Sequence, residues 1–216
     1  TGPRPRAAPY NRDMSATLEV YSLGGCGGFG RNATPLVAGG RGLLVDFGIG
    51  FPRAPLPGVS LTVPDATPVA ERVPDLAAIV LTHAHDDHIK GLAFLREAFP
   101  ETEVFASRTT LAWARRALSN GESFATRELK EGVGERVGQF GVDALPVSHS
   151  IPGAVVLRLE GEPGTMVLAT DLRLAPSALG VTWATNGAGS ISQSAASAGQ
   201  AYAQAANRHV KPRYRE

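Results

Sequence analysis

The sequence contains one cysteine and no long apolar run, and it carries almost no net charge. Because Cys26 is alone among 216 residues, no disulfide can form within the chain, and we expect a reducing compartment, the cytoplasm. The formal net charge of +1 does not indicate a general nucleic-acid binder, so any contact with RNA needs a local basic surface. No apolar stretch approaches the roughly 20 residues that span a bilayer, so we expect no membrane partner.

The overall composition favours a turn-rich globular domain. Hydrophobic residues make up 43% of the chain, and 25 glycines with 16 prolines argue against a helix bundle or a coiled coil. Residues 1–13 are rich in arginine and proline and lack an apolar signal core, so they are interpreted as a leader or extension. Residues 14–175 form the predicted domain. Residues 176–216, dominated by small and polar side chains, are interpreted as a low-complexity tail or linker.

The hydrophobic pattern predicts a layered α/β fold with more strands than helices. The almost unbroken apolar run 76–81 is typical of a strand that is buried on both faces. Frequent prolines predict a loop over 51–74. The other predicted strands are 17–23, 33–38, 42–47, 103–106, 142–147, 154–160 and 165–169, and the predicted helices are 91–99 and 109–118.

A polar cluster follows this buried run directly. Three histidines and two aspartates occupy the six positions from His83 to His88. Groups packed so closely would disfavour one another's protonation and lose hydration without a structural gain. A divalent cation removes both problems, because imidazole nitrogen and carboxylate oxygen are its usual donors. The cluster therefore predicts a metal site.

The spacing within the cluster favours two neighbouring ions over one crowded site. Residues two apart in an extended segment project to the same side, so His83 and His85 can hold one ion. Asp87 and His88 come after the chain begins to turn and face elsewhere. The remaining ligands must come from distant segments, and the candidates at the ends of other strands are His149 and Asp171.

These residues also carry a family resemblance. The run from Thr82 to His88 resembles the H-x-H-x-D-H signature of the metallo-β-lactamase superfamily, and Asp46 matches its upstream aspartate. Within the superfamily, the chain is most similar to ribonuclease J of the β-CASP group of RNA-processing nucleases. The narrower match covers about 18–174 and rests on the segments 23–32, 63–65 and His149-Ser150-Ile151-Pro152.

The resemblance implies an αββα sandwich with a two-ion site that hydrolyses RNA phosphodiester bonds. The ions implied are Zn²⁺, with Mn²⁺ as the alternative, and the implied metal ligands are His83, His85, Asp87, His88, His149 and Asp171. Of these, Asp87, His88 and Asp171 form the implied catalytic group. Asp87 would hold and deprotonate the attacking water, and Asp171 would lie between the ions. Asp46 would orient a ligand, and Asp86 would face solvent or cap the next helix.

The sequence departs from the ribonuclease J pattern in several places. Only 45 of the 216 residues follow Asp171, too few for the inserted β-CASP domain and the second half of the sandwich. We therefore expect the first half of the sandwich plus flanking strands. His209 is the one histidine in the remaining tail. Gly28 stands where the family commonly has an acidic residue, and Ala169-Thr170-Asp171 replaces the more usual Thr-Gly-Asp.

Three functions remain open on this sequence. The first is a ribonuclease J-like nuclease with RNA as its partner, together with a homo-oligomer or RNA-degradation partners as in the full-length family. The second is a small-molecule hydrolase of the same superfamily, acting on a thioester, lactone or phosphodiester. The third is a non-catalytic metal-binding module. Saturable turnover of small esters without RNA cleavage would favour the second, and metal binding without any hydrolysis the third.

Overall fold

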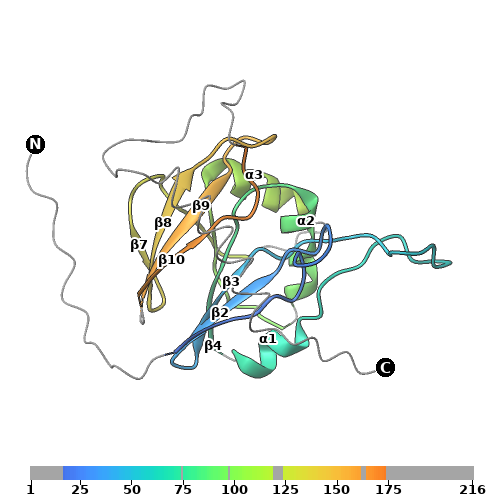
Figure 1. The fold of residues 1–216 in the computed structure, drawn as a ribbon, viewed down its shortest axis with the longest axis horizontal. Coiled ribbons are helices and arrows are strands. Elements are labelled where there is room, and N and C mark those ends of the chain that lie inside the picture. The colour runs from blue at the N-terminus through green and yellow to red at the C-terminus, as the bar shows by residue number, and fades with distance from the viewer. Residues whose placement is uncertain (1–16, 74, 97, 119–123, 162–163, 174–216) are drawn as a thin grey trace, which may run out of the picture.

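The computed structural model describes residues 17–73, 75–96, 98–118, 124–161 and 164–173. The predicted leader 1–13, the predicted tail 176–216 and His209 lie outside these residues. The described residues form two β-sheets and one layer of helices (Figure 1).

The larger sheet has six strands in sequence order, and it combines antiparallel and parallel pairs. Its strands are β1 (Leu18–Val20), β2 (Thr34–Ala38), β3 (Arg41–Val45), β4 (Asp75–Val80), β5 (Val104–Ala106) and β6 (Thr126–Glu128). The pairs from β1 to β3 are antiparallel, and those from β3 to β6 are parallel. The β2–β3 hairpin turns at Gly39 and Gly40, whose φ angles of 55° and 76° suit glycine.

The smaller sheet is antiparallel throughout. Its order is β10-β9-β8-β7, and its strands are β7 (Glu135–Val137), β8 (Phe140–Pro146), β9 (Val155–Gly161) and β10 (Gly164–Leu168). The long β8–β9 pair joins Pro146 to Val155 at one end. The segment between these two strands contains His149.

The helices lie along one face of the larger sheet, and the smaller sheet covers the other (Figure 1). They are α1 (Thr67–Arg72), α2 (Asp86–Ile89), the 3-10 helix η1 (Lys90–Leu95) and α3 (Arg108–Ala117). α3 begins at Ser107, whose hydroxyl accepts a hydrogen bond from the Thr110 amide. Segment 51–66 extends away from the body as a long arm (Figure 1).

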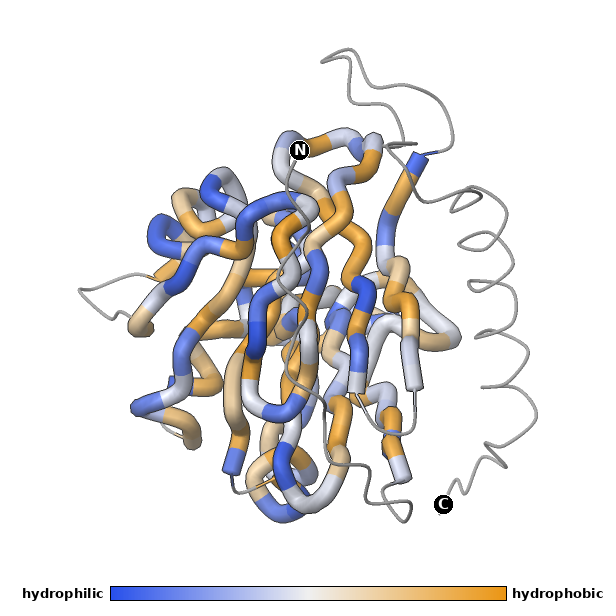
Figure 2. The backbone as a smooth tube through the Cα atoms, turned by 90° about the vertical axis from the view of Figure 1, so that its left-hand side faces the viewer, coloured by the Kyte–Doolittle hydropathy of each residue, from blue (hydrophilic) through white to orange (hydrophobic). Residues whose placement is uncertain are grey.

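The core explains why the central strands are so apolar. Successive strand residues point to opposite faces, so in β3 Leu43 and Val45 pack toward the smaller sheet while Leu44 packs toward the helices. β4 does the same, with Val80 facing one core and Ile79 the other. Figure 2 shows long hydrophobic stretches through the body of the molecule and hydrophilic residues in several outer turns. The helix–sheet–sheet layering is the half sandwich that the sequence predicted.

Most predicted elements are present, with three differences. Thr67–Arg72 is helical although the prolines predicted a loop there, because Pro68 lies in the first turn, where a missing amide costs nothing. The helix predicted at 91–99 begins earlier, as α2, and ends as η1. The short strands β6 and β7 were not predicted, since three largely polar residues give no clear alternation.

Candidate metal centre

The site lies where the ends of several strands meet. After β4, residues Leu81 to Ala84 continue to α2, and the backbone amide of Val155 in β9 donates to the carbonyl of Thr82. Beside them, Gly48 follows β3 and lies so close to α2 that an added Cβ would be 1.7 Å from the carbonyl oxygen of Asp87. This close approach fixes the start of α2 against the end of β3.

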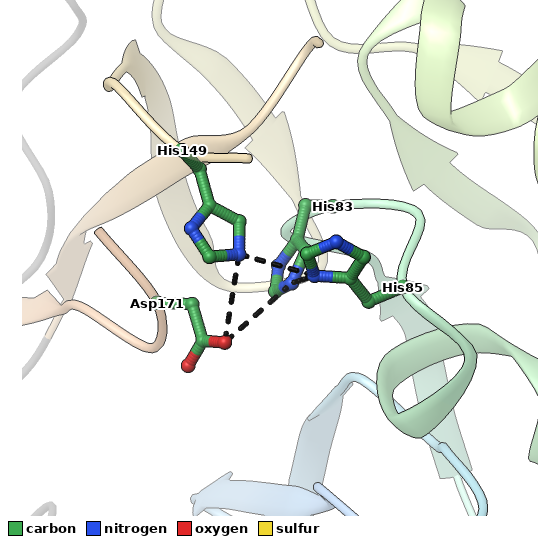
Figure 3. A group of neighbouring side chains, drawn as sticks. All are labelled: His83, His85, His149 and Asp171. Carbon is green, nitrogen blue, oxygen red and sulfur yellow. Dashed lines mark hydrogen bonds and ion pairs between the residues drawn. The ribbon is translucent and has the colours of Figure 1, made fainter. Parts of the chain in front are cut away.

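Three imidazoles from two distant segments converge here (Figure 3). His83 Nε2 lies 3.0 Å from His85 Nδ1, and His149 Nε2 lies 3.1 Å from the same atom. The Asp171 carboxylate faces them, with Oδ2 3.6 Å from His149 Nε2 and 3.9 Å from His83 Nε2. The four ligand atoms lie within 4.8 Å of one another.

His88 and Asp87 lie next to this group, and the ring centroids of His88 and His83 are 3.9 Å apart. His88 Nε2 is 3.9 Å from Asp171 Oδ2 and 3.7 Å from Asp87 Oδ2. The compact group of ligand atoms comprises His83, His85, His149 and Asp171, and the other two predicted ligands, Asp87 and His88, lie beside it. Asp86 is exposed in the first turn of α2 and forms an ion pair with Lys90 at 2.5 Å.

The buried carboxylate of Asp46 determines the tautomers of two histidines. Its Oδ2 accepts hydrogen bonds from His88 Nδ1 at 2.7 Å and from the Thr82 hydroxyl at 2.8 Å, and its Oδ1 accepts from the Thr82 amide. Because Thr82 gives its only hydroxyl proton to Asp46, His83 Nδ1 must donate to Thr82 Oγ1, 3.1 Å away. Both histidines therefore present an unprotonated Nε2 to the centre.

Asn32 is a site residue that the sequence analysis did not single out. Its side-chain nitrogen lies 3.1 Å from the Asp87 carbonyl oxygen, 3.0 Å from Asp87 Oδ2 and 2.9 Å from His88 Nε2. Asn32 is 55 residues from Asp87 in the chain, so local spacing gives no signal for this contact. Its one sequence signal is its place at the end of segment 23–32, on which the narrower family resemblance rests.

Burial and neighbouring charges shift the histidine pKa values in different directions. Burial, then the nearby His88, His149 and His85, lower the pKa of His83 to about 2. Burial and His85 likewise lower the pKa of His149. Burial also acts on His88, but the adjacent carboxylates, Asp46 foremost, outweigh it and raise its pKa. His83 and His149 thus resist protonation and keep their lone pairs available to a cation, whereas His88 takes up a proton more readily than a free imidazole.

This donor set fits a divalent metal ion. Tetrahedral zinc with bonds of about 2.0–2.1 Å places its ligand nitrogens about 3.3 Å apart, close to the separations at His85. The second nitrogen of His85 contacts the Ser150 hydroxyl at 3.3 Å, which holds the ring in place. His149 Nδ1 is buried and finds no hydrogen-bond partner among the described residues.

The centre opens into a cleft of about 670 Å³. Its walls combine site residues with apolar side chains, including the exposed rings of Phe29, Phe51 and Trp113. Phe29 comes from the glycine-rich turn, Phe51 from the start of the arm, and Trp113 from α3. A volume of this size is typical of a pocket that holds a small molecule or one portion of a larger substrate.

Comparison with known proteins identifies the family of this chain. A sequence model of the Beta-lactamase superfamily domain matches residues 41–184. The chain belongs to the metallo-β-lactamase superfamily. On this fold, its His/Asp cluster has the donor set of a divalent-metal site.

Curated relatives give a narrower similarity. The chain is 36% identical to ribonuclease J of Mycobacterium tuberculosis over 160 residues, covering 74% of this chain and 29% of the relative. It is 34% identical to ribonuclease J of Corynebacterium glutamicum over 173 residues, covering 80% and 23%. The chain thus spans less than a third of the length of these relatives.

Solved structures show the same fold at low sequence identity. The metallo-β-lactamase fold protein YhfI from Bacillus subtilis is 19% identical, with a TM-score of 0.53 over 70% of this chain and 61% of that one. A protein of unknown function from Enterococcus faecalis V583 is 19% identical, with a TM-score of 0.53 over 74% and 44%. Within the described residues, no helix is long and apolar enough to cross a membrane.

Proposed function

We propose that the chain is the metal-binding part of a cytoplasmic nuclease that hydrolyses RNA phosphodiester bonds with two divalent ions, Zn²⁺ or alternatively Mn²⁺. The observation that carries this proposal is the convergence of His83, His85 and His149 on one point, with Asp171 and His88 beside them. Similarity to ribonuclease J supports RNA as the substrate. RNA-degradation partners and a homo-oligomer belong to the same proposal.

The ligands divide into two groups. His83, His85 and His149 would hold the first ion, Asp87 and His88 the second, and the Asp171 carboxylate would lie between them. Bound divalent ions supply Lewis acidity, which brings the pKa of water toward neutrality and offsets charge on phosphate oxygens. This arrangement needs neutral imidazoles, which the lowered pKa of His83 and of His149 favours.

The remaining chemistry falls to side chains of this chain. The Asp87 carboxylate would hold the attacking water and accept its proton, while Asn32 keeps Asp87 in position by donating to its Oδ2 and its carbonyl. Asp46 would keep His88 in the tautomer that leaves Nε2 free. The cleft beside Asp87 and Asp171 would admit the strand to be cut.

Metal content and cleavage measured on the same sample test this proposal. We expect two metal ions per chain by elemental analysis and cleavage of 5′-monophosphorylated RNA in zinc or in manganese. The double variant His83→Ala/His85→Ala should lose tight metal binding and cleavage. His209→Ala, which changes the one histidine outside the cluster, should keep both. Unchanged metal content in the double variant would contradict the ligand assignment.

The same assay separates the other functions. Hydrolysis of a thioester, lactone or small phosphodiester without RNA cleavage would assign the chain to the small-molecule hydrolases. About one ion per chain and no hydrolysis of any ester would identify a non-catalytic metal-binding module.

A further inference from the structure

The glycine-rich turn that follows β1 forms one wall of a separate small hollow. This hollow of about 120 Å³ is lined by Arg31, Arg53 and residues of the segment 22–30. Gly25, Gly27 and Gly30 have φ angles of 83°, 79° and 82°, whereas Cys26, Gly28 and Phe29 are not left-handed. Alternation of this kind at Gly25 to Gly27 is typical of the backbone nests that bind anions, whereas Arg31, with φ 58°, donates its amide to the carbonyl of Ile49.

Two arginines face this turn without a carboxylate partner. The Arg31 stem packs over Gly50, where an added Cβ would lie 2.7 Å from Arg31 Cγ, and Arg53 Nη2 lies 3.4 Å from the Cβ position of Gly28. Neither guanidinium forms an ion pair or hydrogen bond with another described residue. Other arginines do pair with carboxylates, namely Arg41, Arg108, Arg127 and Arg158. No acidic side chain of the described chain lines the hollow.

The hollow connects to the metal centre along one surface. Phe51 lines both the metal cleft and a middle hollow of about 320 Å³, and Arg31 and Arg53 line both that middle hollow and the glycine turn. In the middle hollow, the Thr62 hydroxyl is buried without a hydrogen-bond partner in the described residues. Gly30 separates the turn from the metal ligands, since its added Cβ would lie 3.8 Å from Asp87 Cβ.

We propose that Arg31, Arg53 and the glycine turn bind a backbone phosphate of the same RNA strand that enters the metal cleft. Planar guanidinium groups and convergent backbone amides are the donors that hold phosphate oxygens. The exposed rings of Phe29 and Phe51 lie between the two places and offer faces on which unpaired bases stack. The inference rests on the proposed function, because it takes RNA as the ligand.

The salt dependence of RNA binding tests this site without relying on catalysis. The full chain is mixed with a 3′-labelled single-stranded oligoribonucleotide in a chelator, and fluorescence anisotropy gives the binding constant over a range of salt concentrations. Each phosphate contact contributes about 0.7 to the slope of log K against log salt on a single strand. Because both arginines hold the same phosphate, we expect Arg31→Gln/Arg53→Gln to lower the slope by about 0.7, and Arg53→Gln alone to lower it by part of that amount.

Two further variants sharpen the test. Arg41→Gln removes an equal charge at the start of β3, where Arg41 pairs with Asp75 at the surface, and should leave the slope unchanged. Gly28→Glu should lower the slope as Arg53→Gln does, because the added Cβ meets only Arg53 Nη2 and the new carboxylate would pair with it. This variant keeps both arginines, so it also covers the case in which Arg31→Gln fails to fold.

The outcomes are distinguishable from those of the proposed function. A wild-type slope in Arg53→Gln and Gly28→Glu, with RNA still cleaved by the wild type, would overturn this site and leave the nuclease proposal standing. Lower slopes without cleavage by the wild type would support the site and contradict the nuclease. Binding of inorganic phosphate that depends on Arg53, with unchanged RNA slopes, would assign the hollow to free phosphate and overturn the inference.

Discussion

The substitution Asp46→Asn tests how the metal centre is prepared, because it removes a charge while keeping the shape. Asp46 is 1% exposed, and its φ of 58° is one that asparagine also tolerates, so the backbone should not change. An amide at this position can still accept from the Thr82 amide. Its NH₂ group, however, would face Thr82 Oγ1 and His88 Nδ1 as a donor. His88 would then have to protonate Nε2, the nitrogen that faces the centre.

The expected magnitude follows from these contacts. Residues that orient a metal ligand typically contribute 10–100-fold to metal affinity, which corresponds to about 1.4–2.7 kcal/mol. Hydrogen bonds to a charged group contribute about 1.5–3 kcal/mol each to folding and neutral ones about 0.5–1.5 kcal/mol, and the substitution replaces the charged bonds to Thr82 Oγ1 and His88 Nδ1 with neutral contacts. We therefore expect a lower free energy of unfolding in the metal-free protein and weaker binding of the second ion.

Elemental analysis after dialysis at several free-zinc concentrations measures the affinity, and urea denaturation in a chelator measures the stability. The matched control is Asp143→Asn, which removes the partner of Arg158 on the smaller sheet, away from the centre. Full occupancy by two ions at the same free-zinc concentration as the wild type would refute the role assigned to Asp46.

Two further predictions concern the fold. In the metal-free folded protein the pKa of His83 is about 2, whereas in the unfolded chain it is near 6.5. The unfolded chain therefore binds a proton below pH 6.5 that the folded protein does not, and the free energy of unfolding should fall there by up to about 1.4 kcal/mol per pH unit. The raised pKa of His88 acts in the opposite direction, because the stability that it contributes is complete below pH 6.5 and is lost as the pH rises through the pKa of the folded state. The free energy of unfolding, measured by urea denaturation, should therefore be greatest near pH 6.5. A profile that does not change with pH would contradict both assignments. Leu157→Ala should lower the free energy of unfolding, measured by urea denaturation, by about 2–5 kcal/mol, because Leu157 is fully buried between the sheets. Val133→Ala, at an exposed position, should change it little. Equal effects of the two substitutions would refute the placement of this core.

Local pattern was sufficient for the elements that carry the histidine cluster. The apolar run that forms β4 is buried on both faces, so its sequence is unambiguous, and the histidines after it are spaced for one side of an extended segment. His149 and Asp171 were candidates because each follows a predicted strand. Only the fold shows that those strand ends meet, since Arg173 N donates to Ser148 O at 2.7 Å and thereby draws the two segments together.

Contacts between distant segments could not be predicted from the sequence. The role of Asn32 depends on its approach to Asp87, and the hollow formed by Arg31 and Arg53 depends on the packing of the arm beside the glycine turn. Neither leaves a periodic signal. The helix α1 was mistaken for loop for a different reason, because Pro68 ends a helix in its interior but suits its first turn.

The histidine cluster contributes unfavourably to the stability of the fold. The Nε2 atoms of His83 and His149 lie 3.0 and 3.1 Å from the same atom, His85 Nδ1, which has at most one proton to share, so burial of these rings is unfavourable without a further partner. Hydrophobic side chains of similar size would pack there without this penalty. The surrounding strands hold the rings in place through Thr82, which contacts Asp46, His83 and Thr170. Conflict between local and global stability of this kind is expected where function requires it, and a bound cation would remove it.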